Sequence, residues 1–372
     1  MNAIVDLPPQ PKQASSSERR LPQLDGLRGI AVLMVLVCHY IFLPFLGRPT
    51  APSFVGFGFV IFASGVDMFF VLSGFLIGGI LLDHRSSANY FGSFYGRRFC
   101  RIFPVYYGFL ALTALAGVIQ HAHHLPNPVF DAGTPYWMYF LFLQNYSLNW
   151  FGDWDWITVT MAWSLALEEQ CYLTLPTAVK FLSDRLLVVI SAVFVLGAPI
   201  LRYFIPIAPH SVGTLVLTLF RADGLAAGFL CAMLVRSQFK ISSRTLGMVA
   251  VPLAALVVVT HLANSPFEFL RGTTLAVFYS CVLLLAARGA LVLLESSILR
   301  FFGAISYALY LFHQSAIEFL RTLVNHAGIA PFRGEAVFVP VTAFLLVVTG
   351  CWLSWVILEK PLISWARRRF RY

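Results

Sequence analysis

Long apolar stretches recur along the whole chain, and they restrict it to one class of fold. Hydrophobic residues make up 59% of the 372 residues and charged residues only 12%, a composition that ordinary soluble domains of this length do not have. An apolar run of about 18 or more residues is long enough to cross the hydrocarbon core of a bilayer as a helix. The sequence therefore predicts an all-α, polytopic integral membrane protein.

About ten transmembrane helices are predicted. They cover residues 29–46, 54–82, 102–119, 161–179, 186–205, 212–235, 246–262, 273–287, 301–323 and 336–358. A further apolar segment, 136–148, is too short to span a membrane and is interpreted as re-entrant or interfacial. Residues 21–361 then form a single transmembrane domain.

The distribution of basic residues orients these helices. Arg and Lys gather before the first predicted span and at 85–101, 180–185, 236–244 and 360–371. By the positive-inside rule, both chain ends are then cytoplasmic. Arg202, Arg271 and Arg333 are exceptions, because each lies at an outer boundary. The excess of 26 basic over 17 acidic residues is explained by this topology, and we expect no nucleic-acid partner.

The chain ends and the cysteines add three expectations. Residues 1–20 are polar and rich in Pro, Gln and Ser, which predicts a disordered cytoplasmic tail without a cleavable signal. Residues 362–372 are predicted to form a basic cytoplasmic tail. The six cysteines lie in or beside predicted spans, and no metal-site spacing occurs. We therefore expect neither a disulfide framework nor a bound metal.

Ionisable residues inside the predicted spans are the candidate functional residues, because a bilayer makes them expensive. His39 lies about 16 Å along the first helix from Arg28, near the membrane midplane. It is either a functional residue or a hydrogen-bonded core histidine, and the helix alone favours neither. Counting residues along the other spans places several polar side chains at similar depth, namely Asp67, Glu168, Glu169, Arg221, Asp223 and His313. They predict one central chamber, although separate ion pairs, such as Arg221 with Asp223, are the alternative.

The chemistry of these groups suits proton transfer. A neutral histidine can take a proton from a hydroxyl group while a carboxylate orients the ring. Glu168 and Glu169 point about 100° apart on a helix, so only one is expected to face His39, and Glu168 is the favoured one. Arg98 and Arg101 share a helix face if helical. They suit phosphate binding, although a topology anchor or a lipid headgroup contact is the more common use of such a pair.

The motifs that carry these residues resemble those of the membrane-bound acyltransferase-3 family, in the family's order and over nearly the whole chain. The first is LDGLRGIAVLMVLVCHY at 24–40, with Arg28 and His39. The others are GVDMFFVLSGFLI at 65–77, RRFCRIFPVYY at 97–107, WSLALEEQCYL at 163–173, SYALYLFH at 306–313 and EKP at 359–361.

The resemblance implies a bacterial inner-membrane enzyme. It would move an acyl group, usually acetyl, from cytoplasmic acyl-CoA to a hydroxyl group of a cell-surface or lipid-linked carbohydrate. His39 would be the general base or acyl-transfer residue, and Arg28 would position it or the donor. Arg98 and Arg101 would contact coenzyme A phosphates, and Glu168 or Glu169 would orient His39 or bind the acceptor. The implied substrate pocket is lined by Asp67, Ser73, Arg221, Asp223 and His313.

Two other functions fit a polar chamber inside a membrane. A transporter or flippase for a lipid-linked sugar would need no coenzyme A site, and a non-catalytic member of a polysaccharide assembly complex would tolerate loss of His39. The acceptor stays open. The predicted outer segments contain several tryptophans, namely Trp137, Trp150, Trp154 and Trp156. They suit stacking on sugars and equally suit an interfacial belt.

Overall fold

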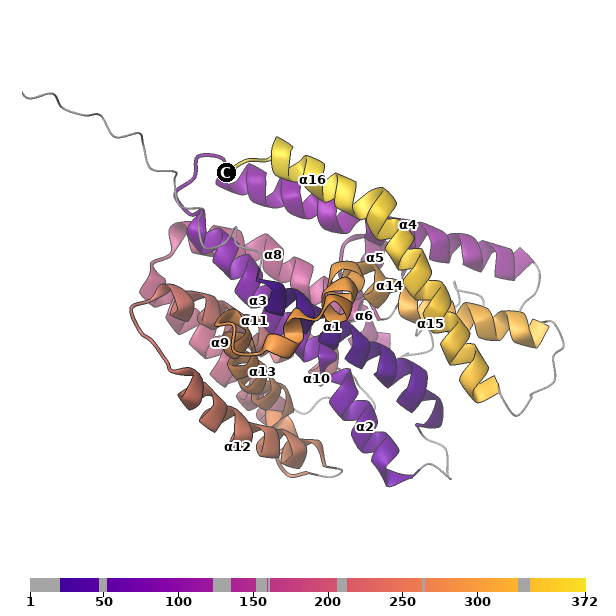
Figure 1. Ribbon diagram of the computed structural model, residues 1–372, viewed down its shortest axis with the longest axis horizontal. Coiled ribbons are helices and arrows are strands. Elements are labelled where there is room, and N and C mark those ends of the chain that lie inside the picture. Colours follow the sequence, from indigo (N-terminus) through magenta and orange to yellow (C-terminus); the bar gives the residue numbers. More distant parts are fainter. Residues whose placement is uncertain are drawn as a thin grey trace, which may run out of the picture.

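A computed structural model describes residues 21–46, 52–122, 135–151, 159, 161–205, 213–262, 265–326 and 335–372. Within these ranges every regular element is a helix, which confirms the predicted all-α bundle (Figure 1). The long helices are α1 (Pro22–Val37), α3 (Gly65–Asp83), α4 (Tyr90–Ala122), α8 (Trp163–Phe181), α9 (Asp184–Phe204), α11 (Thr218–Arg236), α12 (Ser243–His261), α13 (Arg271–Ala287), α14 (Ser297–His326) and α15 (Glu335–Ser354). The predicted tail 1–20, Arg333, Trp154 and Trp156 lie outside the described residues.

Shorter helical elements connect or extend the long ones. They are η1 (Cys38–Phe42), η2 (Leu43–Phe45), α2 (Ser53–Ala63), α5 (Tyr136–Phe140), α6 (Gln144–Phe151), α10 (Gly213–Val216), η3 (Glu268–Leu270), η4 (Val292–Glu295), η5 (Trp355–Glu359) and α16 (Lys360–Arg369). The element η1 is a π-helical turn that directly continues α1. It carries His39 near the end of the first membrane segment.

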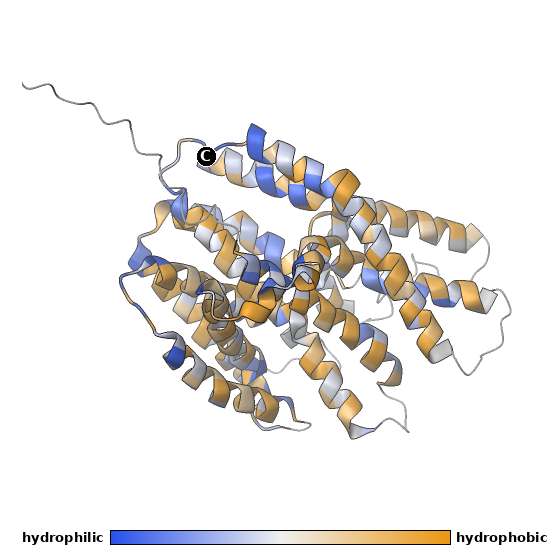
Figure 2. Cartoon of the chain, viewed as in Figure 1, coloured by the Kyte–Doolittle hydropathy of each residue, from blue (hydrophilic) through white to orange (hydrophobic). Residues whose placement is uncertain are grey.

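Eight segments of the described chain are long and apolar enough to cross a membrane. They match eight of the ten predicted spans. The other two predicted spans are α8 and α14, which have 19 and 30 residues but carry the polar residues of the site described below. Figure 2 shows apolar residues along most helices and hydrophilic residues gathered on α16 and the nearby start of α4. The protein is therefore a multi-pass membrane protein.

Glycines allow the central helices to approach closely. A side chain at Gly74 of α3 would collide with the Leu225 carbonyl of α11, and one at Gly228 of α11 would collide with the Val71 carbonyl of α3. Small residues at helix contacts are the usual way in which membrane helices bring their backbones together. This close contact fixes α3, which contributes Ser73 to the site.

The short segment before α8 enters the bundle without crossing it. Neither α5 nor α6 is long enough to span, as the sequence predicted. The Gln144 amide donates to the Ala162 carbonyl (2.8 Å), and the Asn145 amide donates to the Val216 carbonyl (3.2 Å). Both side chains are completely buried. The residue before α8, Ala162, therefore contacts a buried polar side chain of α6.

One end of the bundle, which we call the basic end, gathers the starts or ends of α3, α4, α8, α11 and α16. Lys180 Nζ donates to the Arg85 carbonyl (2.7 Å), and Arg236 pairs with Asp83 (2.7 Å). The predicted tail 362–372 lies along α4 (Figure 1), and Arg97 Nε donates to the Phe370 carbonyl (2.7 Å). Burial raises the pKa of the Tyr372 hydroxyl. The C-terminal residues are thus packed against the bundle.

Candidate functional site

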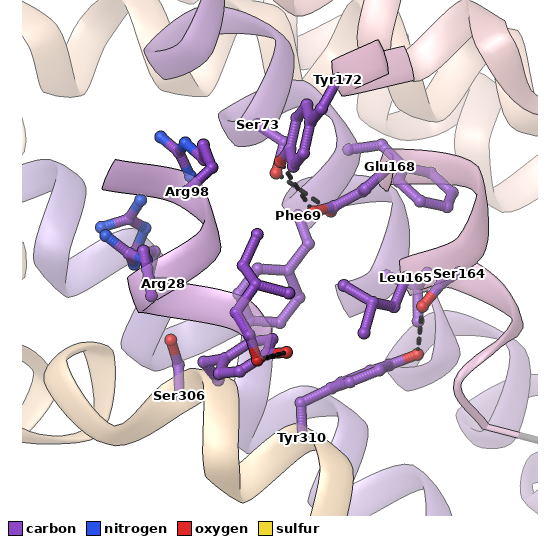
Figure 3. A pocket seen from close by; sticks show the side chains of 15 residues that line it. Arg28, Phe69, Ser73, Arg98, Ser164, Leu165, Glu168, Tyr172, Ser306 and Tyr310 are labelled. Carbon is purple, nitrogen blue, oxygen red and sulfur yellow. Dashed lines mark hydrogen bonds between the residues drawn. The ribbon is translucent and has the colours of Figure 1, made fainter. Parts of the chain in front are cut away.

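A pocket lies between α1, α3, α4, α8 and α14 (Figure 3). Its polar and aromatic side chains come from residues that are distant in sequence. They are Arg28, Phe69, Phe70, Ser73, Arg98, Arg101, Ser164, Glu168, Tyr172, Ser306, Tyr307 and Tyr310. The pocket thus brings together five of the six predicted motifs in one place.

Glu168 is held rigidly on one wall of the pocket. Ser73 Oγ donates to its Oε1 (3.0 Å), and the Tyr172 hydroxyl donates to its Oε2 (2.9 Å). Tyr172 lies one turn further along α8, where i,i+4 side chains meet, while Ser73 reaches across from α3. Both carboxylate oxygens therefore have partners, and their orientation toward the pocket is fixed.

Three arginines give the pocket an excess of positive charge. In Figure 3, Arg28 and Arg98 lie across the pocket from Glu168, and Arg101 also lines it. Arg28 lies 3.7 Å from Asp25, and the Arg98 guanidinium lies 5.4 Å from the centre of the Tyr172 ring. Among the described residues no carboxylate lies within 4.0 Å of Arg98 or Arg101. Guanidinium groups placed in this way suit an anionic ligand such as a phosphate.

His39 and His313 form a pair beyond the pocket. His313 Nε2 lies 3.3 Å from His39 Nδ1, and the ring centroids are 4.9 Å apart. His313 is completely buried, whereas His39 is partly exposed. The ring of Tyr310, which lines the pocket, lies 5.9 Å from the His313 ring. Tyr310 therefore connects the pocket to the histidine pair.

The remaining predicted residues form a separate network of ion pairs. Arg221 pairs with Asp67 (2.6 Å), and Arg202 pairs with Asp223 (2.8 Å). Thr273 also donates to Asp223 (2.8 Å). Arg221 and Asp223 thus have different partners, and Arg202, an exception in the predicted topology, supplies one of them. The expected single chamber is divided into the pocket, the histidine pair and this network.

The two glutamates lie differently from the expectation that one of them orients His39. Glu168 bonds Ser73 and Tyr172, while Glu169 is buried and its Oε1 has no hydrogen-bond partner in the described chain. The Nδ1 partners of His39 are the Val35 carbonyl and His313. Within the described chain, neither glutamate therefore hydrogen-bonds His39. An orienting or acceptor-binding role for Glu168 or Glu169 stays a prediction.

Three tyrosines of the site were not among the residues predicted from the sequence. Tyr172, Tyr307 and Tyr310 all line the pocket, and Ser164 Oγ lies 2.6 Å from the Tyr310 hydroxyl. A helical signal was present for two of them. Tyr172 follows Glu168 by four residues and Tyr310 precedes His313 by three, which are the spacings of side chains on one helix face.

The fold and this site define a multi-pass membrane protein with a cationic pocket and a histidine pair inside its helical bundle. Residues 21–359 match the family model described as an acyltransferase domain. The chain belongs to this family, which confirms the resemblance seen in its motifs.

Two of the relatives that align with part of this chain are named as O-acetyltransferases. The peptidoglycan O-acetyltransferase OatA of Listeria monocytogenes is 32% identical over 168 residues, which is 43% of this chain and 24% of that protein. The O-acetyltransferase OatA of Staphylococcus aureus is 29% identical over 178 residues, 45% of this chain and 26% of that protein. The chain thus aligns with about a quarter of the length of these relatives. No solved structure matches it.

Proposed function

We propose that this protein is an integral membrane O-acyltransferase of the bacterial inner membrane. It transfers an acyl group, acetyl in the simplest case, from acyl-CoA to a hydroxyl group of a cell-surface or lipid-linked carbohydrate. The observation that carries the proposal is the pocket with three arginines, which lies beside a histidine pair in a chain of an acyltransferase family. The names of the two relatives, both O-acetyltransferases, support the acetyl group.

The proposed binding site for the acyl donor is inferred from the positive charge of the pocket. Coenzyme A carries several phosphate charges, and arginine forks bind phosphate with paired hydrogen bonds. Arg98 and Arg101 lie in the first half of α4, which begins at the basic end. The positive-inside rule supports a cytoplasmic location for that end, where acyl-CoA is available. Arg28 and His39 are about 16 Å apart along the first helix, a span that the extended pantetheine arm can bridge.

His39 carries the chemistry in this proposal. It takes the proton of the acceptor hydroxyl, whose oxygen then attacks the acyl carbon. The carbon–sulfur bond breaks, and the coenzyme A thiolate leaves and takes up the proton. An acyl group held briefly on His39 gives the same products in two steps, so both routes need an unprotonated ring nitrogen. Glu168 keeps Ser73 and Tyr172 in place beside the donor.

The test is coenzyme A release from acetyl-CoA by purified protein in nanodiscs, with a panel of sugar acceptors. Release is expected to vanish in His39→Ala, and the KM for acetyl-CoA is expected to rise in Arg98→Ala. Arg85→Ala is the matched control, because Arg85 is an arginine of the same end that pairs with Asp184 outside the pocket.

The possible failures are distinguishable. Release that persists in His39→Ala would move the chemistry to another residue, with His313 as the first candidate. If the wild type shows no turnover with any acceptor of the panel, direct binding of acetyl-CoA distinguishes a missing acceptor from a wrong function. Binding that Arg98→Ala removes supports the donor site, whereas no binding at all overturns the proposal in favour of a lipid-linked sugar transporter.

A further inference from the structure

We propose that His313 is a positioning residue for His39. The Nε2 of His313 accepts a hydrogen bond from the Nδ1–H of His39, and this leaves the Nε2 of His39 free to accept a proton. This inference rests on the proposed function for its consequence in catalysis. The hydrogen-bond arrangement itself stands on the geometry of the two rings and can be tested without any turnover.

The protonation of His313 follows from its backbone contact. His313 Nδ1 lies 2.6 Å from the Tyr310 carbonyl oxygen. A carbonyl oxygen can only accept a hydrogen bond, so Nδ1 must carry the proton. In a neutral imidazole the other nitrogen is then an acceptor. His313 Nε2 therefore presents a lone pair, and it lies 3.3 Å from His39 Nδ1.

The same reasoning fixes the tautomer of His39. Its Nδ1 lies 2.8 Å from the Val35 carbonyl oxygen and 3.3 Å from His313 Nε2. Both neighbours are acceptors, so Nδ1 carries a proton that the two share. Its Nε2 is then unprotonated, and within the described chain it makes no hydrogen bond. Because His39 is partly exposed while His313 is completely buried, His39 is the reactive ring and His313 its support.

This arrangement replaces the carboxylate that often holds a catalytic histidine. Among the described residues no carboxylate oxygen of an Asp or Glu lies within 4.0 Å of a nitrogen of either ring. When His39 Nε2 takes the hydroxyl proton, the new positive charge strengthens the Nδ1–H bonds to Val35 and His313. His313 thus stabilises the protonated ring as the carbon–oxygen bond forms and the carbon–sulfur bond breaks. The proton passes from Nε2 to the thiolate, and His39 returns to its starting tautomer.

Two variants separate this role from simple packing. In His313→Asn the amide can still donate to the Tyr310 carbonyl, but no atom remains at the Nε2 position. In His313→Gln the side-chain oxygen reaches the Nε2 position and can accept from His39. A hydrogen bond to a charged group accounts for about a 10- to 100-fold rate effect. We therefore expect kcat to fall about 10- to 100-fold in His313→Asn and much less in His313→Gln, with the KM for acetyl-CoA unchanged in both.

Tyr40→Phe is the control for helix packing. It removes the hydrogen bond from the Tyr40 hydroxyl to the His313 carbonyl (2.6 Å) without touching either ring. We expect kcat to stay close to that of the wild type. Equal losses in His313→Asn and His313→Gln, or a loss in Tyr40→Phe as large as in His313→Asn, would overturn the positioning role.

Solid-state ¹⁵N NMR of histidine-labelled protein in nanodiscs tests the tautomers directly. The spectra of His39→Gln and His313→Gln assign the two rings among the nine histidines. The expected result is a protonated Nδ1 and an unprotonated Nε2 on both rings, with a nitrogen–nitrogen correlation from His39 Nδ1 to His313 Nε2. A proton on Nε2 of either neutral ring contradicts the inference. If the tautomers are as expected but the wild type releases no coenzyme A, the proposed function fails while the histidine pair stands.

Discussion

At the scale of single residues, the site depends on which neighbour each charged group has. Glu168 and Glu169 are adjacent in sequence, yet only Glu168 lines the pocket and holds Ser73 and Tyr172. The sequence could predict that the two point in different directions, since adjacent helical residues are about 100° apart. The i,i+4 spacing could have indicated Tyr172 as a partner of Glu168, but it could not indicate Ser73, which comes from α3.

The substitution Glu168→Gln tests whether Glu168, and not Glu169, supports turnover. It keeps the size of the side chain but removes the negative charge and disturbs at least one of the two hydrogen bonds. We expect kcat for thioester turnover to fall about tenfold or more, since a hydrogen bond to a charged group contributes about 1.5–3 kcal/mol. The KM for acetyl-CoA should not rise, because the arginines remain. Steady-state kinetics of Glu168→Gln and Glu169→Gln, measured in parallel, checks this. A larger loss of kcat in Glu169→Gln would contradict the role given to Glu168.

At the scale of helices, ion pairs and glycines fix the frame around the pocket. The network of Asp67, Arg202, Arg221 and Asp223 joins α3, α9 and α11. Asp67, Arg221 and Asp223 were expected from the family resemblance to line a substrate pocket, whereas Arg202 was not. The structure places them in ion pairs with one another, so a substrate role for them stays a prediction that needs its own test.

Asp67→Asn distinguishes a stabilising role from a substrate-binding role. The change leaves Arg221 with its charge and no charged partner, and breaking a buried ion pair costs about 3–5 kcal/mol. We expect a lower unfolding temperature in detergent, and partial recovery in the double variant Asp67→Asn/Arg221→Gln, where neither charge remains. A single variant with unchanged stability and a raised acceptor KM would instead favour substrate binding.

The close contact of α3 and α11 gives a second prediction at this scale. In Gly228→Ala the added methyl group meets the Val71 carbonyl, so the helices must move apart. Overpacking of this kind costs about 1–3 kcal/mol. Gly108→Ala is the matched control, because a side chain there meets no atom within 4 Å. Thermal unfolding in detergent should show a loss for Gly228→Ala alone, and equal stability of both variants would show that the contact is not tight.

At the scale of the whole molecule, the apolar pattern predicted most of the fold. Spans of about 18 or more residues fix the number and place of membrane helices without knowledge of their contacts. The pattern was weakest for α8 and α14, whose polar residues build the site and lower their hydropathy. The way the helices pack gives Asp67 and Ser73 of α3 different partners and brings His39 to His313. This packing depends on contacts between helices and is not encoded in local spacing.

The orientation of the molecule can be tested with two engineered cysteines. Arg368→Cys lies in α16 at the basic end. Pro52→Cys lies directly before α2, and α2 and α3 together lead from there to the basic end. The two cysteines are therefore expected on opposite sides of the membrane. The positive-inside rule places the basic end in the cytoplasm. A membrane-impermeant maleimide should therefore label Pro52→Cys in intact spheroplasts and Arg368→Cys only in inverted vesicles. Labelling of Arg368→Cys from outside would put the arginine pocket on the side without acyl-CoA and would rule out the proposed donor, because coenzyme A thioesters are cytoplasmic.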